Sequence, residues 1–313
     1  MTDLQVIGEE SLDVWGKYWK LVQPYRKQLW NYCLRLTGSP WDAEDLLQDT
    51  VLKAFASLSA LSHRQQQLNT KAYLFRVATN HWLDQCRRTG RFKHEELNDE
   101  IWSEEYADPL EINEAIYSLL NHLTPRQAVV FILMESFRFT AKEVAELLAS
   151  TEGAVNGLLN RARKGLYEAR ESGTELKKEH VINVHAESVQ AFIDAYNRKD
   201  YIGLVNMLLD QATFSFVEMN SKEYGKETII KYSLNPNNVS KSHDIYAKSC
   251  NLFGKHAIIF IRQTEQGPIL YDVNTMEWEL NKIARWNCYY FCREFMQYVA
   301  KELGLPLEPV EDF

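Results

Sequence analysis

One stretch of the chain carries basic, amide and aromatic side chains at helical spacing, a combination that suits contacts with nucleic acid. Arginine binds phosphates or a guanine edge, asparagine pairs with an adenine edge, and an aromatic ring stacks on an unpaired base. Residues 72–91 place such groups on or beside one helical arc: Tyr73, Arg76, Asn80, Arg87, Arg88 and Arg91. The pattern predicts a nucleic-acid contact, and a solvated cationic helix is the alternative.

A second polar helix face lies within residues 139–166, which have the pattern of a helix-turn-helix. Thr140 can cap a first helix, and Thr151 can cap a second helix that begins at Glu152. The apolar side of the second helix is expected at Ala154, Val155, Leu158, Leu159, Ala162 and Leu166. Its other side carries the candidate DNA-reading residues Asn156, Asn160, Arg161, Arg163 and Lys164. An ordinary helical hairpin is the alternative.

Carboxylates gather on one face of another predicted helix, which Ser39 and Pro40 open. Asp42, Asp45 and Asp49 share this face, with Gln48 beside them, and no lysine or arginine is expected to pair with the three acids. Like charges at this spacing repel and cost helix stability. The face is therefore a candidate binding surface for a basic partner, and a solvated acidic helix is the alternative.

The sequence shows no catalytic or metal-binding constellation. Five cysteines are scattered along the chain, and the last two, Cys288 and Cys292, are spaced to meet on one side of a helix. No histidine or further cysteine lies at metal-ligand spacing from them, so no metal or cofactor is expected. The acidic residues Asp194 and Glu218 have no evident catalytic partner, and packing or turn roles are favoured for His243–Asp244 and Glu277–Trp278.

Composition and charge limit the class of protein. A chain of 313 residues is long enough for about two domains, and its net charge of −8 argues against a protein that coats DNA unaided. The sequence shows no basic-then-apolar leader and no apolar run near the ~18 residues that span a bilayer. Export and membrane insertion are therefore disfavoured, and a cytoplasmic location is expected.

The first half of the chain is predicted to be helical and to contain two domains. A helix over 11–23 is followed by a second helix that starts at Pro24 and stops at Gly38. The limits are 1–93 for the first domain, 94–114 for an acidic, flexible linker, and 115–172 for the domain with the helix-turn-helix. A charged connector over 173–183 leads to the last domain.

Residues 184–313 change in character and predict an independent α+β domain. Helical residues 188–208 give way to strand-like runs at 212–219, 243–253, 255–263, 267–280 and 282–291, with a short helix near 227–232. A last helix is expected over 293–303. Helices followed by a mainly antiparallel meander predict a curved sheet that can enclose a pocket.

Taken together, the acidic and basic segments make residues 22–170 resemble an extracytoplasmic-function sigma factor of bacterial RNA polymerase. The segment DAEDLLQDTVLKAF is similar to that family's polymerase-clamp helix, and AYLFRVATNHWLDQCRR to its helix for the minus-ten promoter element. Residues 123–166 resemble its domain for the minus-thirty-five element. The resemblance implies that Asp42, Asp45, Gln48 and Asp49 contact core polymerase. It also implies promoter DNA as a partner, with the loop over 63–69 placed to hold an unstacked base.

The last domain resembles the cone-shaped SnoaL-like domains of the nuclear transport factor superfamily. The segments AESVQAFIDAYNRKDYIGLVNMLLDQATF and KIARWNCYYFCREFMQYVAKELGLP carry the resemblance. Some sigma factors of this group use such a domain as a built-in regulator, so an anti-sigma factor or a small ligand is a further partner to consider there. The whole pattern predicts a sigma factor with a C-terminal regulatory domain. The alternatives are a SnoaL-like isomerase or cyclase fused to a DNA-binding module, and a one-component, ligand-sensing transcription regulator.

Overall fold

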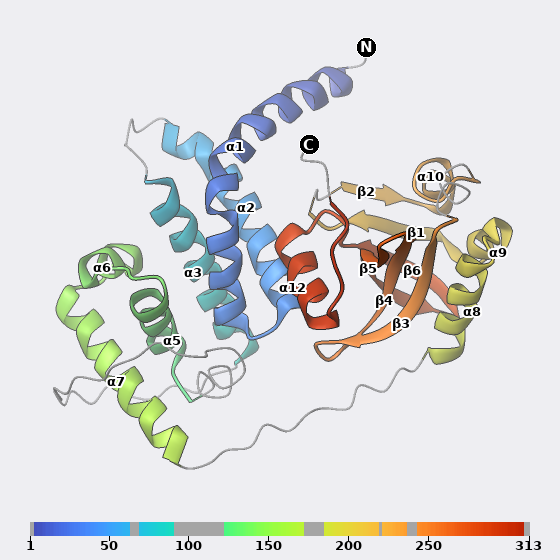
Figure 1. Cartoon of the computed structure of the whole chain (residues 1–313). Helices are drawn as coiled ribbons and strands as arrows, with labels where there is room; N and C mark the ends of the chain where they lie inside the picture. The colour runs from blue at the N-terminus through green and yellow to red at the C-terminus, as the bar shows by residue number, and fades with distance from the viewer. Residues whose placement is uncertain are drawn as a thin grey trace. The chain divides into compact units, whose positions relative to one another are not determined.

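The computed structural model describes residues 3–62, 69–90, 122–171, 185–218, 221–236 and 243–309. The chain forms two compact units, Met1–Lys177 and Lys178–Phe313 (Figure 1). The linker over 94–114 and the connector over 173–183 lie outside the described residues. No described helix is both long and apolar enough to cross a membrane. The predicted fold class, helical domains followed by an α+β domain, is confirmed.

The first unit begins with three packed helices: α1 (Asp3–Thr37), α2 (Pro40–Ser62) and α3 (Thr70–Thr89). The predicted helix break at Pro24 is wrong, because α1 runs through this proline. Proline removes one main-chain hydrogen bond from a helix, but here the fully buried Val22 and Leu29 anchor the helix on both sides of it. The start of α2 at Pro40 is as predicted, and Asn69 caps α3 by accepting from the Ala72 N–H.

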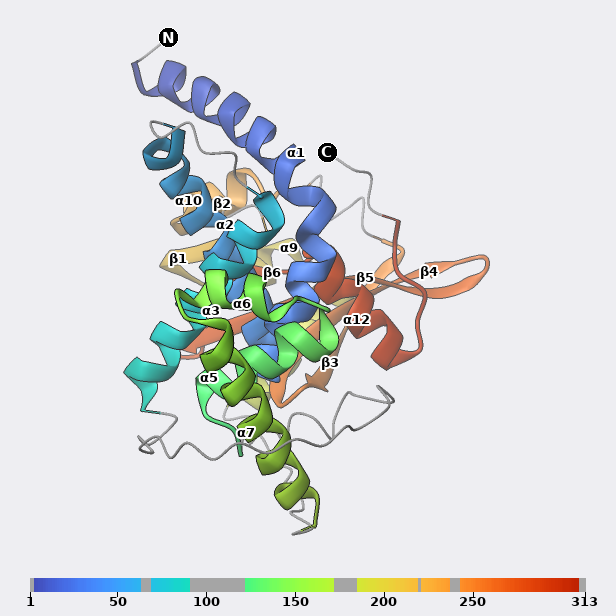
Figure 2. The same ribbon diagram turned by 90° about the vertical axis from the view of Figure 1, so that its left-hand side faces the viewer.

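The second part of the first unit holds α5 (Pro125–Phe131), the π-helical turn η1 (Ile132–Ser136), α6 (Ala141–Leu148) and α7 (Glu152–Glu171). Thr140 forms a capping box with Glu143, and the Ala154 N–H donates to Thr151 Oγ1, so both predicted caps are confirmed. Figure 1 shows α5 between α3 and α7, and Figure 2 shows the turn between α6 and α7 from another side. These caps define a helix-turn-helix.

The second unit is built on one six-stranded sheet in the order β2-β1-β6-β5-β4-β3. Its strands are β1 (Leu208–Phe216), β2 (Ser221–Tyr224), β3 (Ile245–Leu252), β4 (Lys255–Thr264), β5 (Gly267–Glu279) and β6 (Lys282–Cys288). All neighbouring strands are antiparallel except β1 and β6, which are parallel. The five predicted strands are present with shifted ends, and the short strand β2 was not predicted.

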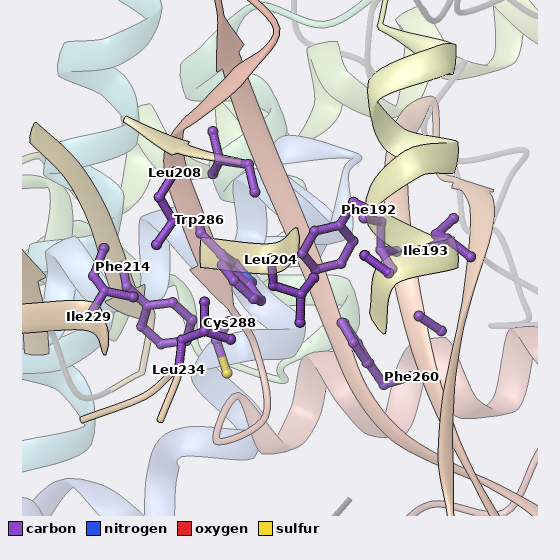
Figure 3. Packing of buried hydrophobic residues seen from close by; sticks show 14 of the residues in the cluster. Phe192, Ile193, Leu204, Leu208, Phe214, Ile229, Leu234, Phe260, Trp286 and Cys288 are labelled. Atoms are coloured by element: carbon purple, nitrogen blue, oxygen red, sulfur yellow. The ribbon is translucent and has the colours of Figure 1, made fainter. Parts of the chain in front are cut away.

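The described residues of this unit also form the helices α8 (Ala186–Asn197), α9 (Tyr201–Asn206), α10 (Lys226–Lys231) and α12 (Arg293–Leu303). Buried apolar residues from the helices and the sheet form one core, and the rings of Phe192, Phe260 and Trp286 gather in it (Figure 3). Phe192 meets Trp286 edge-on, with ring centroids 5.2 Å apart. Cys288 and Cys292, whose spacing would let them meet on one side of a helix, do not share one, because Cys288 ends β6 and Cys292 precedes α12.

Candidate nucleic-acid and protein interfaces

The acidic face of α2 is exposed, as its spacing predicts. Asp42, Asp45 and Asp49 are exposed, and Gln48 is half-buried and donates to Glu44 Oε1 at 2.9 Å. The opposite side of α2 is apolar and buried, with Ala43, Leu46, Leu47 and Ala54 in the core. Burial of one side fixes the rotation of the helix, so the three aspartates point away from the helical core as a group.

One of these carboxylates has a partner that the spacing did not suggest. The Nε2 atom of His81, on α3, lies 2.8 Å from Oδ2 of Asp49, and Lys53, one turn after Asp49 on α2, contacts Nδ1 of the same ring. The expectation named only lysine and arginine, and this histidine partner of Asp49 comes from another helix.

The candidate DNA face of α3 is also exposed. Arg76, Asn80, Arg87 and Arg88 are exposed, while Leu74, Phe75, Ala78 and Trp82 are buried on the other side of the helix. The Tyr73 hydroxyl donates to the main-chain oxygen of Ala54 at 3.3 Å, which ties the ring to α2. Arg87 forms an ion pair with Asp84 at 2.9 Å. Arg91 and residues 63–68 lie outside the described residues.

The helix-turn-helix presents most of its predicted polar face on α7. Asn156, Arg163 and Lys164 are exposed, and Asn160 and Arg161 are half-buried. Ala154, which was expected in the core, is exposed, because the buried arc of α7 is narrower and centres on Val155, Leu159 and Ala162. Ala149 ends α6 in the left-handed region, with φ of 48°, and this reverses the chain toward α7. Arg163 Nη2 lies 2.5 Å from Oε1 of Glu135.

The two halves of the first unit are joined by aromatic side chains. The ring of Phe75 on α3 lies 5.5 Å from that of Phe137 and 5.3 Å from that of Phe139, measured between centroids. Phe137 also meets Tyr32 of α1 edge-on at 5.5 Å. Next to this cluster, Arg76 Nη2 donates to the main-chain oxygen of Glu146 at 2.9 Å. Sequence reasoning missed this contact, because periodicity within a helix does not say which other helix it will meet.

The second unit contains a buried polar group that the sequence did not single out. Asp272 on β5 accepts hydrogen bonds from Asn274 Nδ2 at 2.6 Å and from the Cys288 thiol at 3.2 Å, and Asn274 Oδ1 accepts from Trp286 Nε1. Burial raises the pKa of the Asp272 carboxyl from its ordinary 3.8 to about 7, against the opposing effect of these hydrogen bonds. The sequence offered one signal for this group: Asp272 is an acidic residue on the inward side of a predicted strand.

The acids considered at the sequence level have structural partners. Asp244 pairs with Arg262 at 3.0 Å, Glu277 with Arg285 at 3.4 Å, and Asp194 accepts from Gln190 at 2.8 Å. The ring of Trp278 stacks against the ring of His185, with centroids 6.5 Å apart. The described contacts of Asp194, Asp244 and Glu277 therefore agree with the packing and turn roles.

Comparison with known proteins assigns the two helical segments. The family model Sigma-70 region 2 matches residues 21–92, and the model Sigma-70, region 4 matches residues 113–166. This chain is 28% identical to the ECF RNA polymerase sigma factor SigG of Mycobacterium tuberculosis over 244 residues. The match covers 69% of this chain and 65% of SigG. The matched part is thus slightly less than two thirds of that relative's own length.

Two further relatives are similar over different shares of the chain. The crystal structure of SigJ, an extracytoplasmic-function sigma factor of M. tuberculosis, aligns with 85% of this chain and 93% of its own, at 20% identity and a TM-score of 0.31. The ECF RNA polymerase sigma factor SigL of M. tuberculosis is 31% identical over 144 residues, which are 44% of this chain and 80% of SigL. With both sigma regions matched in order, the chain belongs to the extracytoplasmic-function family of RNA polymerase sigma factors.

Proposed function

We propose that this protein is a sigma factor: it binds core RNA polymerase, directs it to promoters and starts transcription. Its C-terminal domain regulates this activity and has no catalytic role. The proposed partners are core polymerase and promoter DNA. We therefore propose that the protein acts in the cytoplasm. Membership of the family supports the proposal. The arrangement of charge on the first unit indicates which residues would bind each partner.

The observation that carries the proposal is the separation of opposite charges onto two packed helices. The exposed carboxylates Asp42, Asp45 and Asp49 belong to α2, and the exposed Arg76, Arg87 and Arg88 belong to α3, with Asn80 among them. A surface of one sign attracts a partner of the other sign and repels like charge. We assign the acidic face, with Gln48, to polymerase and the basic face to the minus-ten element.

The same reasoning assigns α7 to the minus-thirty-five element. Arg163 and Lys164 lie where phosphate contacts are expected, and Asn156 and Asn160 are nearer to base edges, with Arg161 beside them. Tyr73 and Arg91 complete the proposed minus-ten group. We propose the domain limits given above, 1–93, 115–172 and 184–313, with the linker and the connector between them.

The C-terminal domain is proposed to act through the sigma domains. The connector after α7 is short, so the local concentration of the C-terminal domain near the sigma domains is high, and even a weak contact would be occupied. Truncation after Lys178 is expected to change transcription, measured at several promoters, without loss of solubility. An unchanged output, with no effect of any ligand, would favour a separate enzymatic role for this domain.

Run-off transcription tests the proposal directly. Core polymerase is incubated with the full-length protein and with fragments of the source genome that carry promoters. The expected result is transcripts with defined start sites that depend on the protein and are lost with Asp45→Arg. If core polymerase plus the protein starts no transcript at any promoter, the proposal is wrong.

A further inference from the structure

The carboxylate of Asp49 is fixed at one end and open at the other. Its Oδ2 atom lies 2.8 Å from Nε2 of His81, whose side chain is 7% exposed, whereas the side chain of Asp49 is 53% exposed. A carboxylate has about four lone-pair sites on two oxygens. The contact with His81 therefore leaves Oδ1 of Asp49 able to accept hydrogen bonds from a partner at the surface.

The contact with Asp49 indicates which ring nitrogen of His81 carries a proton. An ionised carboxylate only accepts hydrogen bonds, so Nε2 of His81 is the donor to Asp49. Lys53 contacts Nδ1 of the ring, and its Nζ atom also lies 3.3 Å from Nε2. The side-chain nitrogen of Gln85, on the same helix as His81, lies 3.2 Å from Nε2. Lys53, His81 and Asp49 thus form a chain of contacts between α2 and α3.

A side chain that is already held loses less freedom when a partner binds it. Immobilising a flexible side chain at an interface costs conformational entropy, and ordering it beforehand removes part of that cost. The same logic applies to metal ligands, which neighbouring groups orient through hydrogen bonds. In this chain the orienting group is a buried histidine, and the oriented group belongs to the acidic face of α2.

We propose that His81 is a positioning residue for binding core polymerase. It does not touch polymerase, and it acts by aiming the carboxylate of Asp49 at a basic or N–H group of that partner. This inference rests on the proposed function, because it deepens the assignment of the acidic face. It predicts that His81 matters for polymerase binding only while Asp49 is present.

A double-mutant cycle on the full-length protein tests the inference. The affinity for core polymerase is measured by fluorescence titration for the wild type, His81→Phe, Asp49→Ala and the double variant. His81→Phe is expected to weaken binding about three- to tenfold, within the range for residues in contact. In the Asp49→Ala background the same change is expected to have no further effect. His81→Gln keeps a donor and an acceptor, so it should restore binding to within about twofold of the wild type.

Controls separate positioning from folding. Asp84→Asn, on the same helix as His81, should leave polymerase affinity unchanged, and thermal unfolding of each variant shows whether it is folded. If His81→Phe does not fold, Lys53→Met provides the second test, because Lys53 is exposed and its loss frees Nδ1. Lys53→Met should weaken binding about twofold, and again only when Asp49 is present.

Two results would overturn the inference. Equal losses from His81→Phe with and without Asp49 would show that His81 acts through the fold or by direct contact. No loss of affinity from Asp49→Ala would show that there is no carboxylate contact to position. Asp45→Arg then separates the two proposals: if it still weakens polymerase binding, the sigma-factor proposal stands and only the role of His81 is lost.

Discussion

Arg76 on α3 donates a hydrogen bond from Nη2 to the main-chain oxygen of Glu146 on α6, at 2.9 Å. The proposed minus-ten helix is therefore in contact with the helix-turn-helix that is proposed to read the minus-thirty-five element. The two promoter elements are centred about 25 base pairs apart, which is roughly 85 Å of B-form DNA at 3.4 Å per base pair. Helices in contact with each other cannot read both elements at once, so the proposed assignments require the two domains to separate on a whole promoter.

The first prediction concerns the aromatic cluster beside this hydrogen bond. Phe137→Ala removes ring contacts with Tyr32 and Phe75, each worth about 0.5–1.5 kcal/mol beyond the area they bury. Energy transfer between fluorophores at the exposed positions Ser57 and Tyr167 is expected to fall in this variant, because the two domains spend more time apart. Phe55→Ala, whose ring packs on Trp15 and Tyr18 within the first domain, is the matched control. Equal energy transfer in both variants would contradict the prediction.

The second prediction concerns the acidic face of α2. Asp45→Arg places a positive charge among residues proposed to meet a basic surface of polymerase, so affinity for core polymerase is expected to fall by about tenfold or more. Asp45 is exposed, and the change should leave the thermal unfolding temperature nearly unaltered. Glu187→Arg, an equally exposed acid on α8, makes the same change in net charge and should not weaken binding in the same titration. A similar loss in both variants would point to net charge alone.

The third prediction concerns base recognition by α3. Asparagine can make two hydrogen bonds to an adenine edge, and each good pair of this kind discriminates by about 1–3 kcal/mol. Asn80→Ala is therefore expected to reduce the preference for one base in the minus-ten element by that amount. The measurement is holoenzyme binding to a set of promoters with single-base changes, with Arg88→Ala as a control that should weaken all of them alike. A uniform loss for Asn80→Ala would make it a contact to the DNA backbone.

Much of the architecture followed from local signals in the sequence. The caps at Thr140 and Thr151 defined the helix-turn-helix, and runs of residues that favour strands located five of the six strands. The apolar stripe of α2 was enough to predict that Asp42, Asp45 and Asp49 would share an exposed face, because burial of one side of a helix determines the other. These features depend on residues within a few positions of one another.

The features that sequence reasoning missed depend on partners far along the chain. The contact between Asp49 and His81 joins residues 32 positions apart, and the contact between Arg76 and Glu146 spans 70 positions. The continuity of α1 through Pro24 is also a tertiary effect, since buried residues on both sides hold a helix that local preference would interrupt. Helical and strand periodicity identify a face but not the residue that will cover it.

The fourth prediction concerns the buried carboxyl of Asp272 in the C-terminal domain. Its pKa is raised by burial from 3.8 to about 7 in the folded state, so the folded domain holds this proton more tightly than the unfolded chain. The resulting contribution favours folding below about pH 4. It is lost as the pH rises to about 7, and the loss is on the order of 4 kcal/mol at 1.36 kcal/mol per pKa unit.

Asp272→Asn removes the titrating group while keeping the shape of the side chain. The difference in unfolding free energy between variant and wild type should therefore shift in favour of the variant between pH 5 and pH 8. This free-energy difference is measured by urea unfolding of the full-length protein. The unfolding is detected by chemical labelling of the buried Cys288 thiol, which lies 3.2 Å from Asp272 Oδ2. Asp194→Asn, an exposed acid on α8, is the matched control and should show no such shift. A pH-independent difference between Asp272→Asn and the wild type would mean that Asp272 is ionised throughout this range, and that the hydrogen bonds from Asn274 and Cys288 outweigh its burial.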